Sequence, residues 1–166
     1  LLFCFFFLKQ SFINSSLKKI YNKDFHKDIQ FGDNKKINIE YVSANPTGPI
    51  HIAHLRGAIF GDVLSKLYVK VGFKVLREYY VNDAGSQINK LSNSLYKRYL
   101  ELLGENIKLS EDEYPGEYLI DIAKNIYDQD KDNWQKEDKN KKNIYFKKIA
   151  VDKLLNNIKS DLKLIN

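Results

Sequence analysis

The chain has 166 residues, of which 43% are hydrophobic and 29% charged, and this balance excludes a disordered or fibrous protein and favours a globular domain with a core. Its formal net charge of +6 favours a polyanionic partner such as nucleic acid. Lysine and asparagine are frequent along the whole sequence, however. The charge therefore supports a function argued from other features and does not establish one.

The single cysteine, Cys4, excludes an internal disulfide, and no Cys/His cluster has zinc-site spacing. We therefore expect a reducing compartment and a cytoplasmic protein. The apolar start, LLFCFFFL, is too short to span a bilayer and has no basic flank, so neither a membrane span nor a secretory signal is predicted. We interpret it as a cut end that leaves the remnant of a buried strand or helix, and the chain as a fragment.

Residues 1–36 are interpreted as the remnant of an N-terminal domain and a linker. The apolar start continues into a weak helical pattern up to residue 22. The stretch 23–36 is polar, contains a glycine and has no sustained period, which is typical of a linker.

A strand, a helix and a second strand are predicted next. A β-branched, apolar-rich run over 37–42 indicates a strand, and the Asn-Pro-Thr-Gly-Pro turn at 45–49 ends it. A helix is predicted over 52–71, with Gly72 as its stop, and a strand over 73–81. The apolar stripe expected to bury the helix recurs every four residues: Leu55, Ile59, Val63, Leu67 and Val71.

This order predicts an α/β fold, because a right-handed βαβ crossover makes the two strands parallel neighbours in a doubly wound, Rossmann-like sheet. Helices are predicted over about 87–103, 117–128 and 144–163, with a solvated or frayed charged stretch before the last. No later strand completes the sheet. We therefore divide the chain into 1–36, the βαβ part at 37–103, and a helical insertion at 104–166.

The segment SANPTGPIHIAHLRGAIFGD joins the first strand to the helix. Ligands of open parallel sheets bind beyond the carboxyl ends of the strands, and a helix N-terminus favours phosphate. His51 and His54 are three residues apart, so both imidazoles are expected on one face of the first helical turn. There they can donate to phosphate oxygens and stabilise a pentavalent transition state. Capping or surface histidines explain the pair alone equally well; its place at a strand–helix turn favours nucleotide binding.

Other phosphate and metal motifs are absent. The sequence contains no G-x-x-x-x-G-K-[ST], and no G-x-G-x-x-G follows the first strand. H-x-x-H lacks the glutamate of H-E-x-x-H, and the third histidine, His26, falls in the linker. A zinc site is therefore disfavoured, and we expect no metal bound by the protein itself.

Three blocks, in order, resemble the arginyl-tRNA synthetase family of class I aminoacyl-tRNA synthetases. IEYVSANPTGPIHIAHLRGAIFGD and GFKVLREYYVNDAGSQI are similar to the start of its catalytic domain, and YPGEYLIDIAK is similar to a further segment. The resemblance covers residues 37–166. Residues 1–36 weakly resemble the end of the family's N-terminal tRNA-binding domain and its join to the catalytic domain.

The resemblance also implies residue roles. His51 and His54 match the signature histidines that contact ATP phosphates and stabilise the adenylation transition state, with Pro49 and Ala53 in the same ATP-binding segment. The positions that match the arginine-binding carboxylate and amide are Glu40 and Asn45. A carboxylate suits a guanidinium because their hydrogen bonds are charge-assisted.

The implied activity is that of a ligase in translation. ATP, accompanied by Mg²⁺, activates L-arginine to arginyl-adenylate, and the arginyl group is then transferred to tRNA(Arg). The fragment by itself is expected to be inactive. The alternative is a non-catalytic, synthetase-like module that binds nucleotide or tRNA.

Ala53 departs from the family pattern, which has glycine between the two histidines. A β-carbon there is expected to crowd the adenine ring, at a cost of about 1–3 kcal/mol. Such a cost corresponds to a loss of about tenfold or more in ATP affinity. The family's Lys-Met-Ser-Lys-type loop and anticodon-binding helices are also not found in these residues.

Overall fold

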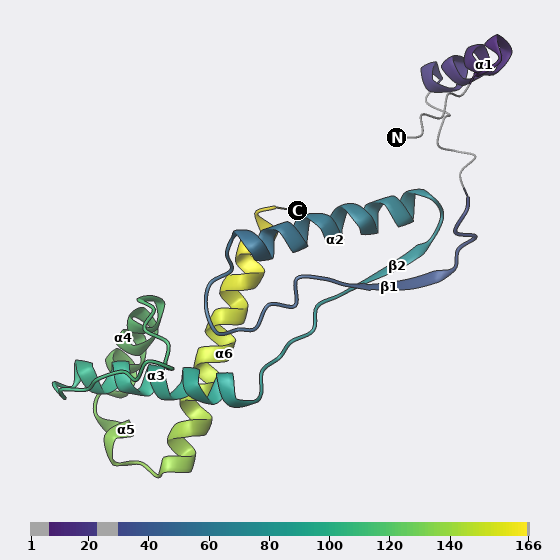
Figure 1. Ribbon diagram of the computed structural model, residues 1–166. Coiled ribbons are helices and arrows are strands. Elements are labelled where there is room, and N and C mark those ends of the chain that lie inside the picture. The colour runs from purple at the N-terminus through teal and green to yellow at the C-terminus, as the bar shows by residue number, and fades with distance from the viewer. Residues whose placement is uncertain (1–6, 23–29, 166) are drawn as a thin grey trace. The chain divides into compact units, whose positions relative to one another are not determined.

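The computed structural model describes residues 7–22 and 30–165, drawn as a ribbon in Figure 1. The predictions for Cys4, for His26, for most of the apolar start and for the first half of the linker lie outside these residues. By their contacts the residues form two compact units, which are described separately: Leu1–Ile39 with Gly61–Glu78, and Glu40–Phe60 with Tyr79–Asn166.

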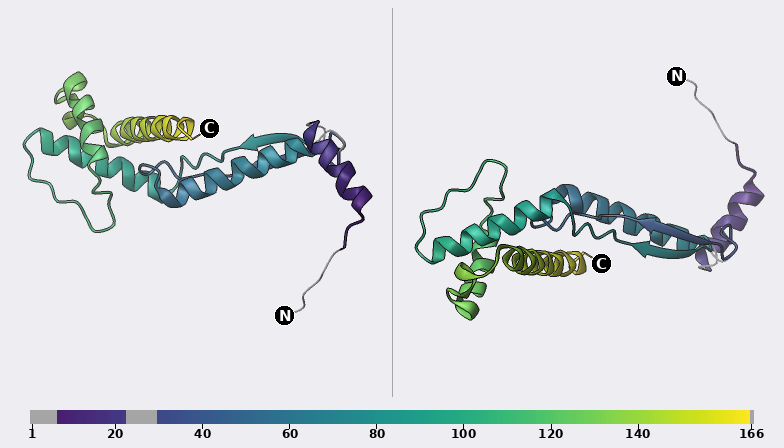
Figure 2. Two further views of the ribbon diagram at one scale, coloured as in Figure 1. Left: turned by 90° about the horizontal axis from the view of Figure 1, so that it is seen from above. Right: turned by 90° about the horizontal axis from the view of Figure 1, so that it is seen from below.

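The first unit contains a parallel pair of strands. β1 (Lys36–Glu40) and β2 (Lys74–Glu78) are hydrogen-bonded neighbours, and the views in Figures 1 and 2 agree that they run side by side. The helix α2 (Ile52–Lys70) connects them. The βαβ prediction is therefore confirmed. α1 (Gln10–Tyr21) confirms the helical pattern predicted before residue 22, and none of its residues is buried.

Both strands are shorter than the sequence predicts. β1 ends at Glu40 because Val42 and Ser43 have left-handed backbone, with φ of 67° and 40°, which a strand cannot contain. β2 ends at Glu78, and the N–H of Tyr80 donates to the Ser43 side chain (3.0 Å) instead of to a strand carbonyl. The chain therefore leaves the sheet earlier on both strands.

α2 buries small side chains instead of its predicted apolar stripe. Ala58 is 3% exposed and Ser65 is 0% exposed, and the Ser65 hydroxyl donates to a carbonyl one turn earlier (2.7 Å). Three members of the stripe, Ile59, Val63 and Leu67, are each about half exposed. The helix limits agree with the prediction, but the face that packs does not.

Gly72 ends α2 as predicted, in a left-handed conformation with φ of 93°. Its carbonyl accepts from the N–H of Asn34 (2.9 Å), and a β-carbon on Gly72 would lie 2.8 Å from the Gln30 Oε1 atom. The left-handed backbone conformation therefore favours glycine at this position, and a β-carbon there would also displace the Gln30 side chain.

The second unit is built on three helices. α3 (Ser86–Leu102) packs against α4 (Tyr118–Asp130) and α6 (Lys139–Lys163), and Figure 1 shows α6 crossing α3. These helices confirm the three that were predicted, although α6 begins five residues earlier. The division of the chain at residue 103 stays a prediction. The core between the helices consists of Leu91, Leu95, Tyr99, Leu119, Ile122, Ala123, Ile126, Phe146, Ala150 and Leu154.

The charged stretch before α6 is more ordered than expected. It contains α5 (Asn133–Lys136), and the Trp134 indole stacks on the Tyr145 ring with centroids 3.9 Å apart. Trp134 Nε1 and the Tyr145 hydroxyl both donate to Asp130 Oδ2, at 2.6 and 2.5 Å. Burial and the Asp130 hydrogen bond raise the pKa of Tyr145 to about 12. The aromatic contacts, which span 11 residues of sequence, explain why this stretch is not frayed.

Asp138→Ala is expected to destabilise the protein by about 0.5–2 kcal/mol, because Asp138 Oδ1 caps α6 by accepting from the N–H groups of Asn140 (2.8 Å) and Lys141 (3.3 Å). Urea denaturation measures the change. Asp132→Ala is the matched control, since Asp132 occupies the same position at α5 and its side chain makes no capping hydrogen bond. Equal loss in both variants would contradict the capping role.

Candidate functional site

Two buried residues anchor the turn between β1 and α2. Ala44 is buried and Pro46 is fully buried, while the N–H of Thr47 donates to the Asn45 carbonyl (2.8 Å). The two prolines of the turn have no N–H to donate. The buried prolyl ring therefore fixes the path of the backbone toward Pro49 and α2.

Two tyrosine hydroxyls hold the carbonyl groups of this turn. Tyr79 donates to the Ala44 carbonyl and Tyr118 donates to the Thr47 carbonyl, each over 2.6 Å. Burial raises the pKa of both hydroxyls above the usual value, so both remain protonated donors throughout the physiological range. The sequence predicts Tyr79 only as part of the strand over 73–81 and gives Tyr118 no role.

His51 and His54 lie face to face at the start of α2. Their ring centroids are 3.9 Å apart with an interplanar angle of 29°. The His51 carbonyl accepts from the N–H groups of His54 (2.8 Å) and Leu55 (3.1 Å), so His51 begins the first turn. The expectation that both imidazoles share one face of that turn agrees with this geometry.

The hydrogen bond to His54 defines the proton that its ring can donate. The N–H of His51 donates to His54 Nδ1 (3.3 Å), so the neutral ring carries its proton on Nε2. Burial, and then the neighbouring His51, lower the pKa of His54. The neutral ring is thus favoured in the folded protein, and the associated stability is present above pH 6.5 and is lost as the pH falls through the lowered pKa.

Glu40 is exposed at the end of β1, and its carboxylate is oriented by Ser43. The Ser43 hydroxyl donates to Glu40 Oε1 (2.7 Å) and accepts from the Tyr80 N–H (3.0 Å). The left-handed backbone of Val42 and Ser43 turns this hydroxyl back toward Glu40. A β-branched residue such as Val42 rarely adopts that conformation, and strain of this kind is concentrated at functional sites.

Asn45 is held by two other amides. Its Nδ2 donates to Gln87 Oε1 (3.0 Å), and its Oδ1 accepts from Asn82 Nδ2 (3.2 Å). Gly85 is the N-cap of α3, which has no side-chain cap, so the Asn82 side chain holds Asn45 and does not cap the helix. Ser43, Asn82 and Gln87 are further residues of the site, and only their place near the strand ends signals them in the sequence.

The remaining predicted residues, Pro49 and Ala53, are both exposed, and Ala53 lies in the first turn of α2. The structure thus brings His51 against His54 and surrounds Glu40 and Asn45 with polar partners. Within residues 7–22 and 30–165, no hydrogen bond joins the histidines to Glu40 or Asn45.

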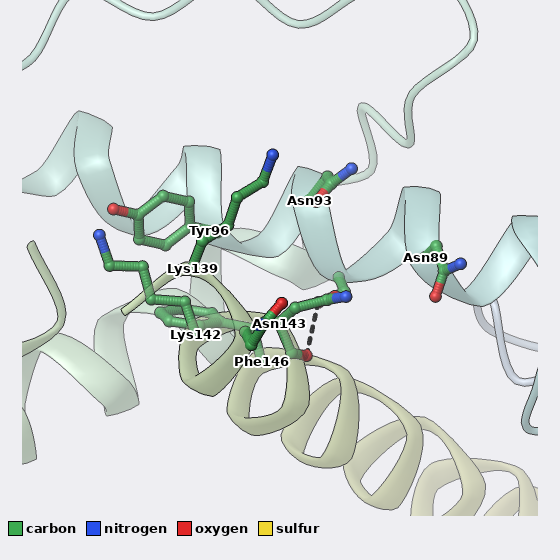
Figure 3. Close-up of a pocket in the computed structure, with 9 residues that line it drawn as sticks. Asn89, Asn93, Tyr96, Lys139, Lys142, Asn143 and Phe146 are labelled. Atoms are coloured by element: carbon green, nitrogen blue, oxygen red, sulfur yellow. Dashed lines mark hydrogen bonds between the residues drawn. The ribbon is translucent and has the colours of Figure 1, made fainter. Parts of the chain in front are cut away.

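A separate cavity of about 290 Å³ lies between α3 and the start of α6 (Figure 3). It is lined by amides and lysines together with the Tyr96 and Phe146 rings, and Lys142 Nζ lies 5.2 Å from the centre of the Tyr96 ring. Across it, the Ser92 hydroxyl donates to the Asn143 carbonyl (3.2 Å). None of the residues that line it comes from the strand–helix turn, so this cavity is not part of the candidate site.

The described part of the chain contains no group of three His, Cys, Asp or Glu side chains arranged to hold a metal ion. Within the same residues, no helix has both the length and the apolar character needed to cross a membrane.

Known proteins similar to this chain identify its family. Residues 16–162 match the family model for tRNA synthetases class I (R), catalytic domain. The arginine–tRNA ligase of Ehrlichia ruminantium strain Welgevonden is 49% identical over 137 residues, which are 82% of this chain and 24% of that protein. The arginine–tRNA ligase of Oceanobacillus iheyensis is 40% identical over 159 residues, which are 95% of this chain and 29% of that protein.

A solved structure agrees with these matches. The crystal structure of a Campylobacter jejuni protein assigned as an arginyl-tRNA synthetase superposes with a TM-score of 0.73 at 37% identity, covering 94% of this chain and 34% of that one. The chain thus spans about a quarter to a third of the length of these relatives. The α/β architecture predicted from the sequence is that of this structural neighbour. By the family model and by these relatives, the chain belongs to the class I tRNA synthetase (R) family and matches its catalytic domain.

Proposed function

We propose that the full-length protein is an arginine–tRNA ligase, which activates L-arginine with ATP to arginyl-adenylate and transfers the arginyl group to tRNA(Arg). The observation that carries this proposal is the stacked His51–His54 pair at the N-terminus of α2, in a chain that belongs to this synthetase family. Mg²⁺ accompanies ATP as part of the substrate.

The start of α2 supplies the groups that ATP phosphates require. The first N–H groups of a helix have no partner within the helix, and the helix dipole places partial positive charge there. His54 adds the N–H of Nε2, and the adjacent His51 ring adds a second donor. When the arginine carboxylate attacks the α-phosphorus and pyrophosphate leaves, these donors stabilise the charge that develops on the phosphoryl oxygens.

Glu40 and Asn45 are proposed to bind arginine. The Ser43 hydroxyl donates to Glu40 Oε1. The other carboxylate oxygen, Oε2, has no partner among the described residues, so Oε2 is available to a guanidinium. Gln87 accepts from the Asn45 Nδ2 atom and Asn82 donates to the Asn45 Oδ1 atom, and together they fix the orientation of the Asn45 amide. The amide suits the α-groups of the amino acid.

The specific observation that favours the second candidate, a non-catalytic nucleotide- or tRNA-binding module, is Ala53. Its methyl group projects from the first turn of α2, where the family has glycine, and it is exposed to any ligand at that turn. The cytoplasmic localisation and the tRNA partner stay proposals that follow from the synthetase function.

Replacing His54 is expected to lower arginine-dependent ATP–pyrophosphate exchange, measured on the full-length protein with tRNA present. His54→Ala is expected to lose about 100-fold to 1,000-fold in kcat, because one preorganised donor is removed. His54→Gln places an N–H close to the position of Nε2 and should retain more activity than His54→Asn. The reverse order would contradict donation from Nε2.

Ala53→Gly is expected to lower the KM for ATP by about tenfold, since it removes the methyl group that crowds the adenine ring. Steady-state exchange kinetics measure the KM. The same change should destabilise α2 by up to about 1 kcal/mol in urea denaturation, because glycine is a poor helix former. An unchanged KM for ATP would show that the methyl group does not meet the nucleotide.

Glu40→Gln is expected to raise the KM for arginine about 10-fold to 100-fold, because a neutral amide cannot make the charge-assisted hydrogen bond to the guanidinium. The KM for ATP should stay the same. Glu111→Gln, at an exposed carboxylate outside the site, is the control and should leave both values unchanged. An equal effect on both substrates in Glu40→Gln would contradict its assignment to arginine.

A further inference from the structure

Tyr118 joins the helical core to the turn that leads into the histidine pair. It is the first residue of α4, and its hydroxyl donates to the Thr47 carbonyl (2.6 Å), which belongs to a residue 71 positions earlier. The contact lies within one compact unit. Tyr118 belongs to the YPGEY segment, for which the proposed function gives no role.

Two glycines provide the space that the Tyr118 side chain occupies. A β-carbon on Gly116 would lie 2.1 Å from Tyr118 Cε1, a distance that real structures do not contain. A β-carbon on Gly48 would lie 3.3 Å from the Tyr118 hydroxyl oxygen. The absence of a β-carbon on Gly116 therefore leaves room for the Tyr118 ring. The absence of one on Gly48 leaves room for the Tyr118 hydroxyl next to the turn.

The backbone on either side of Tyr118 is anchored to the core. Arg98 of α3 donates to the Pro115 carbonyl (2.9 Å) and also to the carboxylate of Glu101 (2.9 Å). Leu119, the residue after Tyr118, is fully buried between the helices. The backbone on both sides of the Tyr118 side chain is thus tied to the helical core.

We propose that Tyr118 is a positioning residue for the nucleotide side of the site. It holds the Thr47 carbonyl, and only three residues, Gly48, Pro49 and Ile50, separate Thr47 from His51. Tyr79 acts at the other end of the turn, on Ala44, next to the arginine-side residues. Tyr118 therefore sets where α2 begins relative to bound ATP. This inference rests on the proposed function and deepens it.

The test compares Tyr118→Phe with Tyr114→Phe in the full-length protein. Tyr118→Phe keeps the ring and removes only the donor, while the hydroxyl of Tyr114 makes no hydrogen bond with the residues that the structure describes. Tyr118→Phe is expected to lower kcat/KM for ATP about 3-fold to 10-fold, the effect of losing one neutral hydrogen bond. The KM for arginine and the thermal midpoint should stay at the values of the Tyr114→Phe control.

Hydrogen exchange of the amides of Thr47, Gly48, Ile50 and His51 provides a readout that does not depend on catalysis. Without substrates, these amides are expected to exchange faster in Tyr118→Phe than in Tyr114→Phe, because the turn opens more often. The positioning role is supported if Tyr118→Phe lowers kcat/KM for ATP, leaves the KM for arginine unchanged and speeds amide exchange.

Other outcomes overturn it. Equal losses for both substrates with a lower thermal midpoint show a structural role only, and identical behaviour of the two variants shows that the hydroxyl positions nothing. If the unsubstituted protein has no arginine-dependent pyrophosphate exchange, the proposed function fails instead. In that case amide exchange still tests whether Tyr118 holds the turn. Faster exchange in Tyr118→Phe would support this contact, and unchanged exchange would overturn it.

Discussion

The hydrogen bonds from two tyrosine hydroxyls to the carbonyl oxygens of Ala44 and Thr47 fix the turn on which the candidate site depends. Pro46 cannot donate to a strand partner, and the left-handed backbone at Val42 has already taken the chain out of the sheet. No regular ladder of hydrogen bonds is available to such a segment. Two of its carbonyl groups accept hydrogen bonds from tyrosine side chains, and these bonds hold the turn that precedes α2.

The supporting groups are buried and the groups proposed to meet substrate are exposed. Ala44 and Pro46 lie inside the unit, whereas Glu40, Asn45 and His51 face solvent. Each exposed group is nevertheless oriented by a neighbour: Glu40 by a serine hydroxyl, Asn45 by two amides, and His51 by the ring of His54. Side chains fixed in this way lose little conformational entropy on binding, which is the advantage of a preorganised site.

Much of the local structure could be predicted from the sequence, because periodicity and turn residues report local geometry. The limits of α2, its stop at Gly72 and the pairing of His51 with His54 all follow from spacing. The early end of β1 could not be predicted, since nothing in the β-branched run indicates that Val42 adopts a left-handed conformation.

Contacts between segments that are distant in the sequence could not be predicted either. The hydrogen bond from Tyr118 to Thr47 joins residues 71 positions apart, and no local pattern distinguishes this tyrosine from one that only packs in a core. The same holds for Trp134, whose charged neighbours indicate a solvated stretch although its ring stacks on Tyr145. In both cases a tertiary contact determines the position of the side chain, and local composition does not indicate that contact.

The proposed function requires the full-length protein to activate arginine and no other amino acid. tRNA-dependent ATP–pyrophosphate exchange by the purified full-length protein, carried out with each of the standard amino acids in turn, tests this requirement. We expect exchange with arginine and background rates with the others. Exchange with a different amino acid, or none with any of them in the native protein and in its Ala53→Gly variant, would contradict it.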